Sequence, residues 1–425
     1  MILTAGVLFA CLTGCKIVKD APRSEQTAEM KADAPETATP QAMPSYAPSP
    51  EPTEEPDPEP TPEPTAQPTP EPSSNPVLLR ANEIIDAMTE REKICQLFIV
   101  YPEHVAGVPR VTQSGELLAE GFSEYPVGGL VYSADSLVTS EQVKEMTAGA
   151  QKLSKLGLFI CADEEGGTVN RLMHTIGTTY IGPMFSYRND GADTARNNAR
   201  TIAADMAVHG FNTNFAPVAD VWSNPANTVI GSRAYSDDFA QAAELVAAAV
   251  EGFHEVGVLC VLKHFPGHGD TLADSHNTSA YVYKTEEQLM EQEMLPFISG
   301  IEAGADMVMI GHLTVEAISP VPATVSYDIL TGLLRGKLGF DGVIITDGLE
   351  MSALTDLYSD GEIAVRCILA GADILLGPGD LGEAVSAIEA ALDNGSLTLD
   401  RIEESVRRIL AIKLKYGIIN TDPRS

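Results

Sequence analysis

From residue 77 onward, short apolar runs alternate with longer stretches in which apolar residues recur at helical spacing. Stretches such as TARNNARTIAADMAVHG (194–210) and AQAAELVAAAVEGFHEVG (240–257) predict helices. The short runs have the length and continuity of buried strands. They are VGGLVYS (127–133), LFICAD (158–163), FNTNFAPVADV (211–221), VLCVLKHF (258–265), DMVMIGHL (306–313), GVIITDG (342–348) and DILLGPG (373–379). The pattern predicts a repeated unit of one strand followed by one helix.

Polar side chains recur where these predicted strands end. They are Asp163, Asp220, Lys263, His264, His312 and Asp347. In a barrel, the carboxyl ends of all strands meet on one face, whereas a doubly wound open sheet gathers its polar groups mainly at one switch point. We therefore expect an α/β fold, a (β/α)8 TIM-type barrel over residues 77–420, with the open sheet as the alternative.

Residues 15–76 have a different composition from the rest of the chain. The stretch 16–76 contains 16 of the 28 prolines, twelve acidic residues and four basic residues, and its sequence repeats a pattern of the type EPTPEPT. It has too few large apolar side chains to bury a core. We expect residues 15–76 to form a disordered, extended linker rich in Pro, Glu and Thr.

The first fourteen residues, MILTAGVLFACLTG, form an apolar segment that is too short to span a bilayer. Leu12-Thr13-Gly14-Cys15 resembles the lipobox of bacterial lipoproteins. That resemblance implies a signal peptide over residues 1–14, a lipid on Cys15 and a location on the extracellular face of the cell membrane. One departure is that no lysine or arginine precedes the apolar segment.

The formal net charge of −33 and the cysteine positions narrow the partners and the chemistry. A chain with this much negative charge repels nucleic acid and anionic bilayers, which argues against both as electrostatic partners. We therefore expect the protein to contact the membrane through the lipid only. Cys95, Cys161, Cys260 and Cys367 each lie inside an apolar run. We expect them to be reduced core residues, although an exported protein with an even number of cysteines could form disulfides.

The stretch KHFPGHGDTLADSH (263–276) concentrates chemistry at the end of one predicted strand. Lys263 and His264 close the strand, and glycines follow them. Asp274 then stands two residues before His276, where a carboxylate can hold a histidine's tautomer and raise its basicity. A single Asp–His pair of this kind could also belong to a polar loop that makes only local hydrogen bonds. The density of titratable groups in this stretch favours a proton-transfer site instead.

The whole stretch resembles the signature of family 3 glycoside hydrolases, in the bacterial β-N-acetylglucosaminidase (β-N-acetylhexosaminidase) branch that uses a histidine as acid/base. Four further segments match the same family in the same order. They are DEEGGTVNR (163–171), the turn IGSR (230–233), ITDGLEM (345–351) and the terminal RIEESVRRILAIKLKYGI (401–418). The resemblance implies a single catalytic barrel domain that needs no cofactor and removes terminal GlcNAc from peptidoglycan- or chitin-derived glycans, including muropeptides.

The resemblance also implies the roles of individual residues. Asp347 matches the nucleophile that forms a covalent glycosyl intermediate in retaining enzymes. Its neighbour Gly348 stands where the family commonly has a second aspartate. His276 matches the general acid/base, and Asp274 its partner. The residues that match sugar-binding positions are Asp163, Arg171, Arg233, Lys263 and His264.

Four other functions remain open from the sequence. A histidine acid/base could admit an anionic acceptor, so the chain could be a phosphorylase on the same substrates. It could instead be a non-catalytic sugar-binding lipoprotein, although such a protein has no use for a nucleophile and an acid/base pair. A metal-dependent hydrolase would rest on His264, His268, Asp274 and His276, whose spacing suits a rigid ligand set poorly. A two-domain β-glucosidase of the same family would take its acid/base from a second domain.

Overall fold

The computed structural model describes residues 75–272 and 280–419, and these form a (β/α)8 barrel of the TIM type. By its contacts the chain divides into two units, 1–68 and 69–425, and the whole barrel belongs to the second. Residues 15–74 of the predicted linker, which include Cys15, lie outside the described residues, as do Asp274 and His276.

Eight strands pair in parallel in the order β10-β1-β2-β3-β4-β5-β7-β9. Their bounds are β1 (Phe98–Val100), β2 (Gly129–Val131), β3 (Phe159–Ala162), β4 (Thr213–Asn214), β5 (Leu259–Phe265), β7 (Met307–Ile310), β9 (Val343–Thr346) and β10 (Leu375–Leu376). A parallel bridge between Ile345 and Ile374 joins the last strands and closes the barrel. A separate parallel pair consists of β6 (Ala280–Val282) and β8 (Leu313–Val315).

Each of the seven apolar runs singled out in the sequence contains one barrel strand. The expected barrel is therefore confirmed, and the open doubly wound sheet is wrong. The sequence pattern did not single out β1, because its apolar residues continue directly from α2. Cys95, Cys161, Cys260 and Cys367 are buried and free, as expected.

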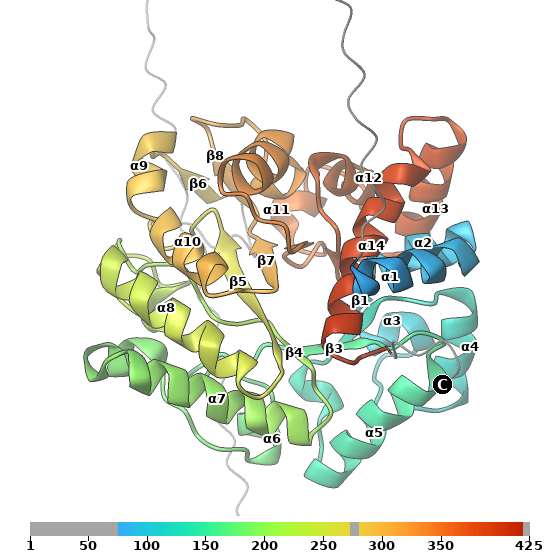
Figure 1. Cartoon of the computed structure of the whole chain (residues 1–425), viewed down its shortest axis with the longest axis horizontal. Coiled ribbons are helices and arrows are strands. Elements are labelled where there is room, and N and C mark those ends of the chain that lie inside the picture. The colour runs from blue at the N-terminus through green and yellow to red at the C-terminus, as the bar shows by residue number, and fades with distance from the viewer. Residues whose placement is uncertain (1–74, 273–279, 420–425) are drawn as a thin grey trace, which may run out of the picture. The chain divides into compact units, whose positions relative to one another are not determined.

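The helices surround the strands (Figure 1). Those in the first half are α1 (Pro76–Ala87), α2 (Glu90–Gln96), α3 (Pro102–Ala106), α4 (Glu116–Glu124), α5 (Ser140–Leu153), α6 (Leu172–Ile176), α7 (Ala192–Val208) and α8 (Phe239–His254). Those in the second half are α9 (Glu286–Glu291), α10 (Met294–Glu302), α11 (Ser352–Thr355), α12 (Asp360–Ala370), α13 (Leu381–Asp393) and α14 (Leu399–Lys415). The 3-10 helices are η1 (Ala134–Ser136), η2 (Met184–Asp190), η3 (Gly231–Arg233) and η4 (Ala323–Val325), and η5 (Asp328–Lys337) is a π-helix.

The two ends of the barrel domain pack against each other. Helix α1 lies beside α14, so the first and last helices of the described chain are neighbours (Figure 1). Asn75 caps α1, because its side chain accepts a hydrogen bond from the Val77 N–H, and Pro76 occupies the first turn, where its missing N–H costs no hydrogen bond. Helix α1 therefore has a defined start at Pro76.

Candidate active site

A pocket of about 360 Å³ opens at the carboxyl ends of the barrel strands. Residues directly after β1, β3 and β9 line it, together with residues from β5 and β10. Six residues predicted from the sequence lie in this one pocket: Asp163, Arg171, Arg233, Lys263, His264 and Asp347. The structure therefore brings together side chains that are up to 184 positions apart in the chain.

Three consecutive acidic residues follow β3, and each binds a different set of groups. Asp163 faces the pocket and pairs with Lys263, Oδ1 to Nζ at 2.7 Å, and with Arg171 at 3.2 Å. Glu164 turns away from the pocket, and its carboxylate accepts the backbone N–H groups of residues 171, 172 and 173 at 2.6 to 3.0 Å. These bonds tie Arg171 and the start of α6 to the end of β3, so the segment that carries Arg171 has a fixed course.

Glu165 is a pocket residue that the sequence analysis missed. Its buried carboxylate accepts two hydrogen bonds from Arg233, at 2.8 and 2.9 Å, and lies 2.6 Å from Lys263 Nζ. Burial opposes its ionisation, but Arg233 and Lys263 together hold the pKa of Glu165 well below its ordinary value. Glu165 is therefore an anion that orders two of the predicted sugar-binding cations.

Lys263 is the centre of this cluster of charges. Its side chain is only 3% exposed, and it contacts both Asp163 and Glu165. Burial alone would lower the pKa of Lys263, but the two carboxylates outweigh burial and raise it. The lysine is thus a fixed cation, suited to donating hydrogen bonds to a neutral ligand such as a sugar.

His264 is oriented by Asp220. Its Nδ1 lies 2.7 Å from Asp220 Oδ2, and the same carboxylate accepts the backbone N–H groups of His264 and His268. Burial opposes ionisation of Asp220, yet the facing His264 lowers the pKa of that carboxyl group. Because the aspartate fixes Nδ1, the other ring nitrogen is the one that remains for a ligand.

Asp347 follows β9 directly and is partly exposed. Its backbone N–H donates to Ile310 O at 2.9 Å, and its Oδ1 accepts the Gly348 N–H at 2.8 Å. His312 Nε2 lies 2.8 Å from the Gly348 carbonyl oxygen. The backbone around Asp347 is therefore fixed by contacts with Ile310 in β7 and with His312, which follows β7.

Tyr101 and Glu350 also line the pocket and were not predicted. Tyr101 follows β1, whose strand the sequence pattern did not single out. Burial and then the nearby charge of Glu350 raise the pKa of the Tyr101 hydroxyl group. Glu350 was missed because it lies beyond the strand end in a turn, where sequence alone does not show which side chain faces a pocket.

Among the residues that the structure describes, one group of His, Cys and acidic side chains is close enough to share a metal ion. It consists of His254, Cys260 and Asp306, none of which lines the pocket described above. His264 and His268, two of the four ligands considered for a metal-dependent hydrolase, belong to no such group within the described ranges.

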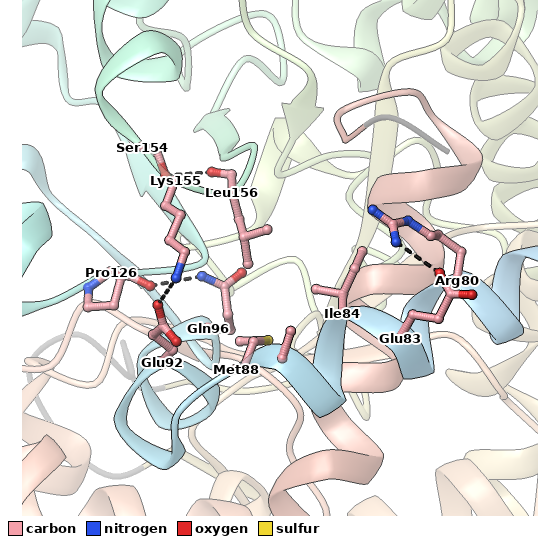
Figure 2. A pocket seen from close by; sticks show the side chains of 11 residues that line it. Arg80, Glu83, Ile84, Met88, Glu92, Gln96, Pro126, Ser154, Lys155 and Leu156 are labelled. Atoms are coloured by element: carbon pink, nitrogen blue, oxygen red, sulfur yellow. Dashed lines mark hydrogen bonds and ion pairs between the residues drawn. The ribbon is translucent and has the colours of Figure 1, made fainter. Parts of the chain in front are cut away.

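Figure 2 shows a second pocket, of about 220 Å³, whose lining residues lie near the amino ends of the strands. Its lining comes from α1, α2 and the segments that precede β2 and β3. Lys155 pairs with Glu92 on one side of it, and Arg80 pairs with Glu83 on the other. None of the predicted site residues lines it, so we assign the chemistry to the larger pocket at the carboxyl ends of the strands.

Comparison with known proteins supplies independent evidence. Residues 89–412 match the family described as Glycosyl hydrolase family 3 N terminal domain. The chain is 34% identical to a β-hexosaminidase A of Pseudoalteromonas piscicida over 70% of its own length, and it spans 55% of that relative. It resembles the structure of a family 3 β-N-acetylglucosaminidase from a Paenibacillus strain, with TM-score 0.74, 36% identity and coverage of 78% of this chain and 63% of that one. The chain also resembles the structure of a β-glucoside phosphorylase, BglX, with a TM-score of 0.74 and 25% identity. That match covers 83% of this chain and 64% of the phosphorylase.

Proposed function

The chain belongs to glycosyl hydrolase family 3, and we propose that it is a retaining exo-β-N-acetylglucosaminidase that removes terminal GlcNAc from peptidoglycan- or chitin-derived glycans. The observation that carries the proposal is the position of Asp347, which shares one pocket with the cluster around Lys263. A nucleophile must reach the anomeric carbon of a sugar that other groups hold in place. The names of the similar β-hexosaminidase and β-N-acetylglucosaminidase supply the sugar class.

In the proposed first step, an Asp347 oxygen attacks the anomeric carbon and the bond to the leaving oxygen breaks. His276, assisted by Asp274, protonates that oxygen. In the second step His276 removes a proton from water, whose oxygen displaces the carboxylate of Asp347. Both residues of the dyad lie outside the described residues, so their roles rest on the sequence.

Sugar binding is proposed for Asp163, Arg171, Arg233, Lys263 and His264. The carboxylate of Asp163 can accept two hydroxyl hydrogens, while Lys263 and Arg171 can donate to hydroxyl and acetamide oxygens. A volume of about 360 Å³ lies at the small end of ligand pockets, which supports recognition of one terminal sugar.

Turnover of p-nitrophenyl N-acetyl-β-glucosaminide tests the proposal. We expect release of GlcNAc with the β configuration retained, followed by release of GlcNAc from GlcNAc-MurNAc and chitobiose. No turnover of any of the three would favour the non-catalytic sugar-binding lipoprotein. Formation of GlcNAc 1-phosphate in phosphate buffer would favour the phosphorylase, the alternative that similarity to the phosphorylase BglX keeps open.

We also propose that the protein is held on the extracellular face of the cell membrane by a lipid on Cys15. The lipobox-like sequence before Cys15 and the proline-rich composition of residues 16–76 support this location. In the part of the chain that the structure describes, no helix is both long and apolar enough to cross a bilayer.

A further inference from the structure

His254, Cys260 and Asp306 form a cluster at the amino ends of the barrel strands. His254 is the last residue of α8, Cys260 is the second residue of β5, and Asp306 directly precedes β7. The pocket that holds Asp347 opens at the opposite ends of the strands. The cluster is therefore separate from the proposed chemistry, on the face of a barrel where side chains serve stability.

The three side chains point their ligand atoms at one another. His254 Nε2 lies 2.9 Å from Asp306 Oδ2 and 3.7 Å from Cys260 Sγ, and the three ligand atoms all lie within 4.8 Å of one another. Zinc bonds of about 2.0 to 2.3 Å in a tetrahedron place two ligand atoms roughly 3.3 to 3.6 Å apart. The two measured separations lie on either side of that range, so small side-chain rotations would let the three atoms bind one ion.

The donor types of the cluster are those that bind zinc. Thiolate, imidazole and carboxylate groups are all zinc ligands, whereas Ca²⁺ and Mg²⁺ prefer oxygen ligands. Cys260 and Asp306 supply two negative charges, which balance the charge of Zn²⁺. Cys260 is fully buried and free of any disulfide, so its sulfur is available as a ligand. Water can supply a fourth ligand, because a quarter of the His254 side chain is exposed.

Asp306 is held in position by the residues at the end of α14. Its Oδ1 accepts the Tyr416 hydroxyl group at 2.7 Å and lies 3.2 Å from Lys415 Nζ. The same hydroxyl lies 2.9 Å from Oδ2, which also accepts the Cys260 N–H at 3.4 Å. Carboxylates that bind metals are oriented by hydrogen bonds of this kind. The charge of Lys415 opposes a cation, but its side chain is 60% exposed and it contacts Oδ1, not the oxygen that faces His254.

We propose that His254, Cys260 and Asp306 bind a zinc ion that stabilises the barrel at the amino ends of its strands. As the Zn–S bond forms, the Cys260 thiol gives its proton to water. The imidazole proton of His254 moves from Nε2 to Nδ1, so that Nε2 can bind the ion. The carboxylate of Asp306 then exchanges its hydrogen bond from Nε2 for a bond to the metal. The ion links α8, β5 and the start of β7, and it takes no part in the glycosidase reaction.

Co²⁺ tests the site in the full chain, because it takes the same ligands as Zn²⁺ and absorbs light. A thiolate bound to Co²⁺ gives a charge-transfer band in the near ultraviolet, and a four-coordinate site gives strong visible absorption that aqueous Co²⁺ lacks. After treatment with EDTA and removal of the EDTA, one equivalent of Co²⁺ should produce both signals in the wild type. Zn²⁺ should then abolish them by displacing Co²⁺.

Variants identify the ligands. Cys260→Ser should lose the near-ultraviolet band. Tyr416→Phe removes only a hydrogen bond to Asp306 and should weaken Co²⁺ binding about tenfold, and His254→Gln should weaken it further. Cys367→Ser, which changes a buried cysteine of α12 outside the cluster, is the control and should retain both signals. Circular dichroism shows that each variant is folded, and His254→Gln changes a partly exposed side chain, so it tests the site even where Cys260→Ser does not fold.

Zn²⁺ should also stabilise the wild type. Above the dissociation constant, each tenfold rise in free Zn²⁺ should add about 1.4 kcal/mol to the free energy of unfolding, and His254→Gln should lack this dependence at the same concentrations. No thiolate band in the wild type, or the same band in Cys260→Ser, would overturn the proposal and leave the three side chains as a hydrogen-bonded network. Neither measurement uses turnover, so both are independent of the proposed function.

Discussion

Lys263 Nζ and Glu165 Oε1 lie 2.6 Å apart at the carboxyl end of the barrel, and both side chains are almost fully buried. Arg233 contacts the same carboxylate from its other side. A buried ion pair of this kind contributes little net free energy, but removing one partner leaves an uncompensated charge. Glu165 therefore fixes the positions of two cations in the pocket, Lys263 and Arg233, at little net cost to the free energy of folding.

Replacing Glu165 with glutamine should lower the free energy of unfolding by about 3 kcal/mol, because Lys263 and Arg233 lose their shared anion while buried. We also expect kcat/KM to fall at least about tenfold, since the sugar-binding cations lose their fixed positions. Urea denaturation and steady-state kinetics measure the two effects. Glu362→Gln, which breaks the exposed pair with Arg366 on α12, is the control and should cost less than about 0.5 kcal/mol.

The same ion pair has a pH dependence with a definite sign. The folded-state pKa of Glu165 is depressed, so its contribution to stability is fully present above the unfolded value of about 4.3 and is lost as the pH falls below that value. The wild type should lose stability between about pH 5 and pH 3 more steeply than Glu165→Gln does. Parallel curves for the two proteins would mean that Glu165 is not a buried anion.

Asp347→Asn should abolish turnover by orders of magnitude while the barrel stays folded, because only the covalent step loses its nucleophile. In the wild type, a slow fluorinated substrate should leave a sugar adduct on the peptide that contains Asp347, visible by mass spectrometry. Circular dichroism of the variant serves as the folding control. A variant with the wild-type rate would remove Asp347 from the mechanism.

His276→Ala should reduce activity on poor leaving groups far more than on activated aryl glycosides, because a good leaving group departs without a proton. Asp274→Ala should give the same pattern more mildly. The measurement is kcat/KM across a series of aryl glycosides with increasing leaving-group pKa. An equal loss on every substrate would instead assign His276 a structural or binding role.

Much of the barrel could be predicted because its strands are buried on both faces and read as continuous apolar runs. The run at Leu259–Phe265, for example, is buried at every position. β1 was not singled out because only Leu97, itself apolar, separates Phe98 to Val100 from the buried end of α2. Short strands that join a helix without a polar boundary have no separate pattern in the sequence.

The site could be predicted only as far as its residues end strands or match a motif. Asp163 and Asp347 do both, and the structure puts them in one pocket. Glu164 and Glu165 are identical neighbours, yet one caps a helix and the other binds Lys263 and Arg233. Which of two adjacent carboxylates faces inward depends on the turn that follows, where Gly166 and Gly167 have positive φ. Sequence alone does not reveal that geometry.

Lys413 is a second feature that the sequence did not indicate, because it reads as an ordinary lysine in an amphipathic helix. It is fully buried in α14, donates to Gln96 Oε1 at 2.9 Å and lies over the ring of Phe159. Burial lowers the pKa of Lys413 to about 7. Between pH 7 and about 8.5 the unfolded chain therefore binds a proton that the folded chain does not.

Stability should consequently rise with pH over that window, by at most about 1.4 kcal/mol per pH unit from this group. The window ends near pH 8.5 because burial raises the pKa of thiols such as Cys95, so ionisation of the unfolded cysteines then favours unfolding. Lys413→Met should flatten the rise in urea midpoints between pH 7 and 8.5, whereas the exposed Lys152→Met should not. Equal slopes in all three proteins would contradict a neutral Lys413.

The segment before the barrel should be dispensable for catalysis and decisive for location. Helix α1 begins at Pro76 with its own cap from Asn75, and the first of the described residues that line the pocket is Tyr101. A protein that begins at Asn75 should therefore be soluble and as active as the full chain. In the full chain, Cys15→Ser should move the protein from the membrane fraction to the soluble fraction, because a serine oxygen replaces the thiol to which the lipid would attach. Loss of activity in the shortened protein would show that residues before 75 are part of the catalytic domain. Retention of Cys15→Ser in the membrane fraction would show that something other than a lipid on Cys15 holds the protein there.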